Sequence, residues 1–116
     1  MVDANREVRA LLNTIEGVTV TYYVPPEANK FPAVSYYEVA TTTGYKYDNA
    51  EQAQISAMAI DIWDKSPNGC AKLAIQIDAI MQGAGWYREL SRDMPPEDLV
   101  RHKSMRYNKQ IFFEED

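Results

Sequence analysis

The fold is decided by one stretch, residues 66–85, which reads SPNGCAKLAIQIDAIMQGAG. Ser66 can cap a helix and Pro67 suits its first turn, while Gly85 is typical of the residue that follows a helix end. Apolar side chains recur between them at helical spacing. They are Cys70, Leu73, Ala74, Ile77, Ile80, Met81 and Ala84. The stretch therefore predicts an amphipathic helix that separates two groups of strands.

A shorter helix and a first strand are predicted near the N-terminus. Apolar residues recur at helical spacing from Asp3 to Glu16, and Gly17 follows as a helix stop. From Val18 to Val24 the apolar residues alternate with period two, which predicts a half-buried strand. The segment from Pro25 to Pro32 is expected to be a loop, because its three prolines cannot donate to a strand ladder.

A long hairpin is predicted next. One strand runs from Ala33 to about Thr43 and the other from about Gln52 to Asp64, and the segment Gly44–Asn49 between them suits a turn. The middle of the hairpin is rich in Thr, Ala and Gln and only weakly apolar. We therefore expect this hairpin to extend beyond the core as an arm.

Two more strands are predicted after the second helix. The first starts at Trp86–Leu90 and is expected to be interrupted by Met94–Asp98, which contains two prolines. The last strand alternates two faces, with Met105 and Tyr107 on one and Arg106 on the other. Runs of strands separated by helices predict one α+β domain over residues 1–116, in the order helix-strand-strand-strand-helix-strand-strand. We expect a mostly antiparallel sheet of four to five strands, with both helices packed on one face and hairpin-type connections everywhere except the crossover through the second helix.

Composition excludes several classes of protein. With 116 residues, 46% of them hydrophobic and a net charge of -5, the chain is an ordinary globular domain rather than a disordered one. Its single cysteine cannot form an internal disulfide, which fits a reducing compartment such as the cytoplasm. No apolar stretch approaches the roughly 18 residues of a membrane span, so we expect no membrane partner and no secretion signal. The 17 acidic residues outnumber the 12 basic ones, which argues against tight binding to nucleic acid phosphates.

We expect no catalytic, cofactor or metal site. Gly83-Ala84-Gly85 stands at a predicted helix end and not between a strand and a helix, as a phosphate-binding loop would. Cys70 lies on the apolar face of the second helix, where a buried and inert thiol is expected. His102 lies between Arg101 and Lys103 at the start of the last strand, which favours a solvated or edge position.

An alternative is a small enzyme or ligand-binding domain that uses Asp61, Asp64, Asp93 and His102. These side chains would have to line one pocket. Asp61 and Asp64 are three residues apart on a predicted strand and so point to opposite faces. We prefer to place Asp64 at the strand end that leads into the second helix.

Tyrosines are the most informative side chains, because the chain has eight of them and several cannot be buried. Tyr45 and Tyr47 flank Lys46 at the tip of the predicted arm. Exposed tyrosines are typical of protein interfaces, although the rings could instead fold back onto their own strands. Arg106 and Tyr107 raise the same two alternatives, a partner or a cross-strand pair. The candidate interface residues are Thr43, Tyr45, Lys46, Tyr47, Asp48, Arg106 and Tyr107.

The order of these features resembles a known family. It includes the amphipathic first helix, a strand of Val, Thr and Tyr, a proline-rich loop, and the phrases FPAVSYYE at 31–38, IDIWDKS at 60–66 and KSMRY at 103–107. Over nearly the whole chain, this pattern is similar to the small tail terminator and tail completion proteins of long-tailed bacteriophages and related prophage particles.

The resemblance implies a structural virion protein with no enzymatic activity. Such proteins assemble as a ring, usually of six subunits, on the head-proximal end of the tail tube, where the ring caps the tube and presents a surface to the neck or head. The implied partners are other copies of the chain, the tail tube protein and a neck or head-completion protein. DNA would pass through the lumen without specific binding, which suits an acidic protein. A head-closure or neck adaptor protein of the same particle is an alternative of the same size and architecture.

Overall fold

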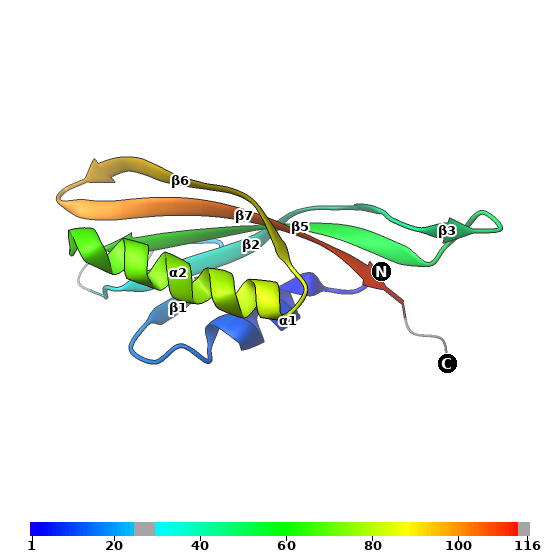
Figure 1. The fold of residues 1–116 in the computed structure, drawn as a ribbon, viewed down its shortest axis with the longest axis horizontal. Helices are drawn as coiled ribbons and strands as arrows, with labels where there is room; N and C mark the ends of the chain where they lie inside the picture. Colours follow the sequence, from blue (N-terminus) through cyan, green and yellow to red (C-terminus); the bar gives the residue numbers. More distant parts are fainter. Residues whose placement is uncertain (25–29, 114–116) are drawn as a thin grey trace.

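A computed structural model describes residues 1–24 and 30–113. The chain forms two helices and seven strands within these ranges (Figure 1). In chain order they are α1 (Ala4–Leu12), β1 (Thr19–Tyr22), β2 (Ala33–Thr43), β3 (Lys46–Tyr47), β4 (Ala50–Glu51), β5 (Ala53–Asp64), α2 (Pro67–Gly83), β6 (Tyr87–Glu97) and β7 (Val100–Phe112). The predicted α+β class and order of elements are confirmed, with the addition of the short β3–β4 pair.

Five strands form one sheet in the order β1-β2-β5-β7-β6, and every neighbouring pair is antiparallel except β1 and β2. The expectation of a hairpin-type connection between β1 and β2 was wrong, because Thr19–Tyr22 pairs in parallel with Ala33–Tyr36. The two strands begin side by side, and the Thr19 N–H donates to the Pro32 carbonyl at 3.1 Å. The predicted loop Pro25–Pro32 lies partly outside the described residues.

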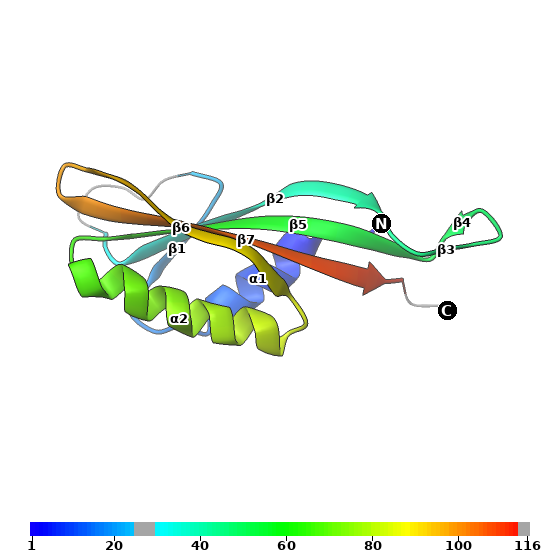
Figure 2. The same ribbon diagram turned by 45° about the horizontal axis from the view of Figure 1, so that its top comes forward.

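Both helices cover the same face of the sheet, as predicted (Figures 1 and 2). The core lies between this face and the helices. Its fully buried large side chains come from every layer and include Val8, Leu12, Val34, Met58, Ile60, Ile62, Ile77, Met81, Trp86, Met105 and Tyr107. The opposite face of the sheet carries no helix in the described part of the chain, and we call it the open face.

Helix α1 is shorter than the predicted Asp3–Glu16. The Asp3 side chain accepts a hydrogen bond from the Asn5 N–H at 3.0 Å and caps the start. After Leu12 the chain tightens into successive turns in which N–H groups bond three residues back. Ile15 nevertheless remains buried, and Gly17 takes the expected left-handed conformation with φ of 75°.

Helix α2 follows the prediction closely. The Ser66 hydroxyl accepts a hydrogen bond from the Gly69 N–H at 3.3 Å, and Gly85 has φ of 92° after the helix end. The apolar stripe faces the sheet, because Cys70, Leu73, Ala74, Ile77 and Met81 are all buried.

The predicted interruption of the strand after α2 was wrong. β6 continues through Pro95 and Pro96 to Glu97, with an irregular register between Met94 and Glu97. β6 is an edge strand, where proline is tolerated because no ladder partner is missed on its outer side. The turn to β7 falls instead at Asp98 and Leu99, both of which have positive φ.

The hairpin of β2 and β5 forms the predicted arm, which projects beyond both helices (Figures 1 and 2). It helps to give the molecule its elongated shape, with extents of 53, 24 and 23 Å. The strands pair from Ala33–Trp63 to Thr43–Gln54 with one bulge after Glu38. At the tip, β3 and β4 form a tight hairpin whose turn residues Asp48 and Asn49 have φ of 51° and 62°.

Candidate interaction surfaces

The tip of the arm brings together five of the seven candidate interface residues. Thr43, Tyr45, Lys46, Tyr47 and Asp48 follow one another there and all are exposed. The Tyr47 side chain is 64% exposed and Tyr45 is 53% exposed. The ring centroids of Tyr45 and Phe112 are 6.3 Å apart, so the Tyr45 ring lies beside the end of β7. Tyr47 has no ring contact within the described part of the chain.

The base of the arm is braced by the N-terminal segment. Gln54 is fully buried, and its side chain accepts from the Val2 N–H at 2.8 Å and donates to the Val2 carbonyl at 2.9 Å. Its amide also donates to the Ser56 hydroxyl at 2.8 Å. Gly44 approaches the opposite strand closely, and its N–H donates to the Ala53 carbonyl at 2.9 Å. These bonds hold the arm in line with the sheet.

The arm also has two strand edges with no neighbour in the described part of the chain. β1 ends opposite Tyr36, so β2 from Tyr37 to Thr43 pairs only with β5. β6 begins opposite Asn108, so β7 from Lys109 to Phe112 likewise pairs only with β5. The arm therefore presents unprotected strand edges as well as exposed rings.

A shallow pocket of about 310 Å³ lies on the open face and spans four strands. Its lining includes the apolar side chains of Val39 from β2 and Leu90 from β6, which are 44% and 42% exposed. Arg92 and Arg106 also line it, and neither guanidinium has an ion-pair partner among residues 1–24 and 30–113. The sequence carries no signal for the pocket as a whole, because its residues come from separate strands, and of its lining only Arg106 and Tyr107 were among the predicted interface residues.

Of the last two candidates, only Arg106 is available to a partner. Adjacent strand residues point to opposite faces, and Arg106 points to the open face. Tyr107 points toward the helices and is 0% exposed. Its assignment as an interface residue was wrong, because the alternation of β7 places it in the core.

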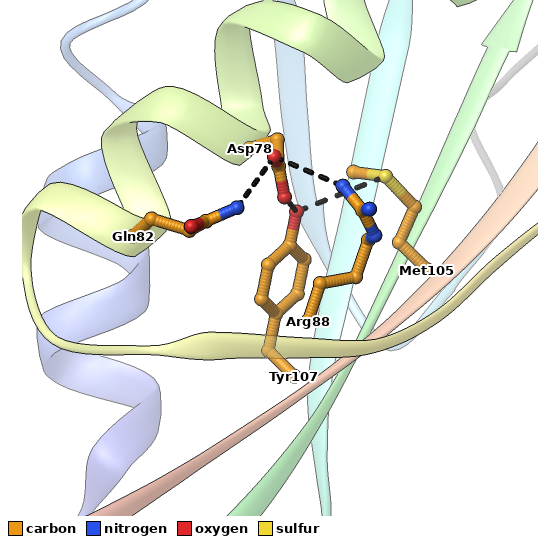
Figure 3. Close-up of polar contacts among 5 residues, drawn as sticks. All are labelled: Asp78, Gln82, Arg88, Met105 and Tyr107. Atoms are coloured by element: carbon orange, nitrogen blue, oxygen red, sulfur yellow. Dashed lines mark hydrogen bonds and ion pairs between the residues drawn. The ribbon is translucent and has the colours of Figure 1, made fainter.

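Tyr107 instead belongs to a polar network around Asp78 on α2 (Figure 3). Its hydroxyl donates to the Asp78 carboxylate at 2.7 Å, Gln82 donates to the same carboxylate at 2.7 Å, and Arg88 forms an ion pair with it at 2.9 Å. Burial, and then the hydrogen bond and negative charge of Asp78, raises the pKa of Tyr107 far above its usual value. The phenol stays protonated and ties α2 to β7, and the Arg88 ion pair ties α2 to β6.

The four side chains of the alternative enzymatic site do not converge. His102 Nε2 lies 2.9 Å from Asp61 on the open face, where its ring stacks on Trp63 at 4.5 Å. Asp93 pairs instead with Lys103 at 2.9 Å. His102 and Asp93 line a pocket of about 370 Å³ that Asp61 does not line. His102 lies on β7, which has a neighbour on each side, so the expected edge position was wrong.

Asp64 and Cys70 have the structural positions predicted for them. Asp64 ends β5 and accepts a hydrogen bond from the Ser66 N–H at 3.4 Å, just before α2. Cys70 is buried, and burial followed by the negative charge of Asp64 raises the pKa of its thiol. Among the described residues, no group of three or more His, Cys, Asp or Glu side chains could hold a metal ion.

Comparison with known proteins gives no family assignment. No protein-family model matches the chain, and no curated protein sequence matches it. In the described part of the chain, neither helix has the length and apolar character needed to cross a membrane.

Proposed function

We propose that this protein is a structural virion protein that assembles into a ring, on the pattern of the bacteriophage tail terminators that its sequence resembles. The observation that carries the proposal is the arm, whose tip exposes Tyr45 and Tyr47 beyond the helix-covered part of the sheet. Exposed aromatic rings on a rigid projection favour a protein partner, because tyrosine buries a large area at little entropy cost.

The geometry favours head-to-tail contacts between copies. The arm lies at one end of an elongated subunit, and we propose that a different part of the next subunit receives it. Contacts between unlike surfaces build a closed ring when the rotation between subunits closes. A ring needs no catalytic site, and we propose no enzymatic activity.

In the proposed assembly, the ring sits on the head-proximal end of the tail tube. It ends growth of the tube because its upper face differs from that of a tube subunit, and it offers that face to a neck or head-completion protein. DNA passes through the lumen. The net charge of -5 supports passage without binding, because like charges disfavour contact with phosphates.

The experiment is a tube-capping assay. Tail tube protein is polymerised with and without this protein, and tube length and end structure are measured by electron microscopy. The proposal predicts shorter tubes with a ring at one end. Tubes of unchanged length with bare ends would contradict a terminator. A ring found between neck components of intact particles, but never on isolated tubes, would assign it instead to the neck adaptors.

A further inference from the structure

The pocket on the open face has the chemistry to receive the arm tip of a second copy of this chain. We propose that the arm of one subunit docks in the pocket of its neighbour, with Tyr47 between Val39 and Leu90 and with the Asp48 carboxylate against Arg92 and Arg106. This inference rests on the proposed ring and names the two surfaces that make its contact.

The first support is apolar complementarity. Val39 and Leu90 are large apolar side chains left 44% and 42% exposed on opposite sides of the pocket, and Ala57 adds a small side chain to its lining. A volume of about 310 Å³ is at the lower end of the range for sites that take small organic groups, and a phenol ring is such a group. Tyr47 is 64% exposed and has no ring contact of its own among the described residues.

The second support is charge complementarity. The pocket holds the two arginines and one acidic side chain, Glu89, which accepts a hydrogen bond from the Asn108 amide at 2.8 Å. The arm tip carries three charged side chains, Lys46, Asp48 and Glu51, all exposed and without an ion-pair partner within residues 1–24 and 30–113. Lys46 and Glu51 lie opposite each other in the β3–β4 pair, on the face that Tyr47 does not share, so Asp48 in the turn is the acidic residue next to Tyr47. The pocket therefore carries a net positive charge, and the arm tip carries a net negative charge. A guanidinium can also stack on a tyrosine ring, which adds to the attraction.

The third support is reach. Strands β4 and β5 lead from the tip to Ala57 in the pocket lining, and the seven residue steps from Ala50 to Ala57 span roughly 23 Å of nearly extended chain. The arm is continuous with the strands that carry its own pocket, and the bonds of Gln54 hold its base in line. It cannot fold back into that pocket. An arm that docks in this pocket therefore belongs to another copy, which makes the contact head-to-tail.

The test uses two variants that damage opposite sides of the contact. The arm variant is Tyr45→Ala with Tyr47→Ala, and the pocket variant is Arg92→Glu with Arg106→Glu. Arg6→Glu is the matched control, because Arg6 is exposed on the helix side of the molecule. Thermal unfolding of each variant checks that the monomer is folded. Arg92→Glu alone, at an exposed position, replaces the double pocket variant if the half-buried Arg106 proves essential for folding.

Native mass spectrometry gives the readout. The wild type and Arg6→Glu are expected to form rings, whereas each damaged variant needs at least about a tenfold higher concentration to assemble. When the two damaged variants are mixed, the intact arm of one meets the intact pocket of the other. We expect a one-to-one dimer of two 13.2 kDa chains that does not grow further.

Other outcomes overturn the proposal. If the pocket variant assembles like the wild type, the arm docks elsewhere, although the ring itself stands. If the pocket variant forms normal rings but no longer binds tail tubes, the pocket receives the tube protein and not the arm. If the mixed variants remain monomeric, the two surfaces do not meet. If the wild type never assembles at any concentration or on tubes, the proposed function fails together with this inference.

Discussion

The helix-covered body of the molecule and the arm are built from the same strands, but the side chains of these strands are buried in the body and exposed in the arm. In the body, β5 and β7 bury Ile60, Ile62 and Met105 against two helices. In the arm, the same two strands carry Ile55 and Phe112, which are 38% and 60% exposed. One pair of strands thus supplies both a stable core and a projecting surface. We expect substitutions of buried residues to lower stability, and substitutions at the arm tip or in the open-face pocket to lower assembly.

The largest effect on stability is expected for Ile77→Ala in α2. Ile77 is 0% exposed, so truncation leaves a cavity and should lower the free energy of unfolding by about 2 to 5 kcal/mol. Ile75→Ala is the matched control on the same helix, because Ile75 is 72% exposed and should change stability by less than about 0.5 kcal/mol. Urea unfolding measures both. Equal losses would show that α2 does not pack by the face seen here.

A smaller loss is expected for Tyr107→Phe, which removes the hydrogen bond to Asp78 but keeps the ring. Hydrogen bonds to charged groups are worth about 1.5 to 3 kcal/mol, so the free energy of unfolding should fall within that range. Tyr87→Phe is the control, because Tyr87 is 62% exposed on β6. A loss as small as that of the control would mean that the Asp78 network does not fasten α2 to the sheet.

The same tyrosine gives the body a characteristic dependence on pH. Its pKa is raised in the folded state, mainly by burial and then by Asp78, whereas in the unfolded chain it titrates near 10. Its contribution is therefore complete below about pH 10 and is lost as the pH rises further, because only the unfolded chain releases the proton. We expect Tyr107→Phe to lose less stability than the wild type between pH 9 and 11, a range of roughly one unit either side of that pKa. Parallel curves of stability against pH would contradict the buried, protonated phenol.

The variant Gln54→Ala tests the base of the arm, because it removes the two hydrogen bonds between the Gln54 side chain and Val2. We expect a loss of about 1 to 3 kcal/mol and faster hydrogen exchange across residues 37–56, with little change in α2. Gln110→Ala is the control, because Gln110 is exposed on the neighbouring strand. If exchange increased equally in the arm and the body, the arm would not be a separate element of stability.

The smallest effect on stability is expected at the arm tip. Tyr47→Ala should change the free energy of unfolding by less than about 0.5 kcal/mol while weakening ring formation. Tyr45→Ala should behave similarly, with a slightly larger loss of stability because its ring lies near Phe112. Thermal unfolding and light scattering measure the two quantities. If each variant lost stability as much as it lost assembly, the two tyrosine side chains would only pack on their own strands and would not contact a neighbouring subunit.

Local patterns in the sequence predicted most of the fold. The cap at Ser66, the apolar stripe of α2 and the alternation of Met105, Arg106 and Tyr107 in β7 are short-range signals, and all three are found. The parallel pairing of β1 and β2 was missed because the alternation of apolar residues predicts a strand but does not predict its direction relative to its neighbour. The continuation of β6 through Pro95 and Pro96 was missed because proline is excluded only from strands with two neighbours, and the sequence did not reveal that β6 is an edge.

The candidate site was predictable only where it is local. The tip from Thr43 to Asp48 is one continuous segment, and its exposure follows from its weakly apolar flanks. The pocket joins Val39 to Leu90 and Arg106 across four strands, so its existence depends on sheet order and register. Tyr107 was misassigned for a simpler reason. The alternation of β7 separated it from Arg106, but only the position of the helices decides which face is buried.

Head-to-tail assembly through the arm is tested most directly by native mass spectrometry of the wild-type protein beside Tyr47→Ala over a range of concentrations. We expect closed rings of the wild type, six copies by the resemblance to tail terminators, and folded monomers of the variant at the same concentration. A wild type that stays monomeric throughout, or a variant that forms rings as readily as the wild type, would contradict it.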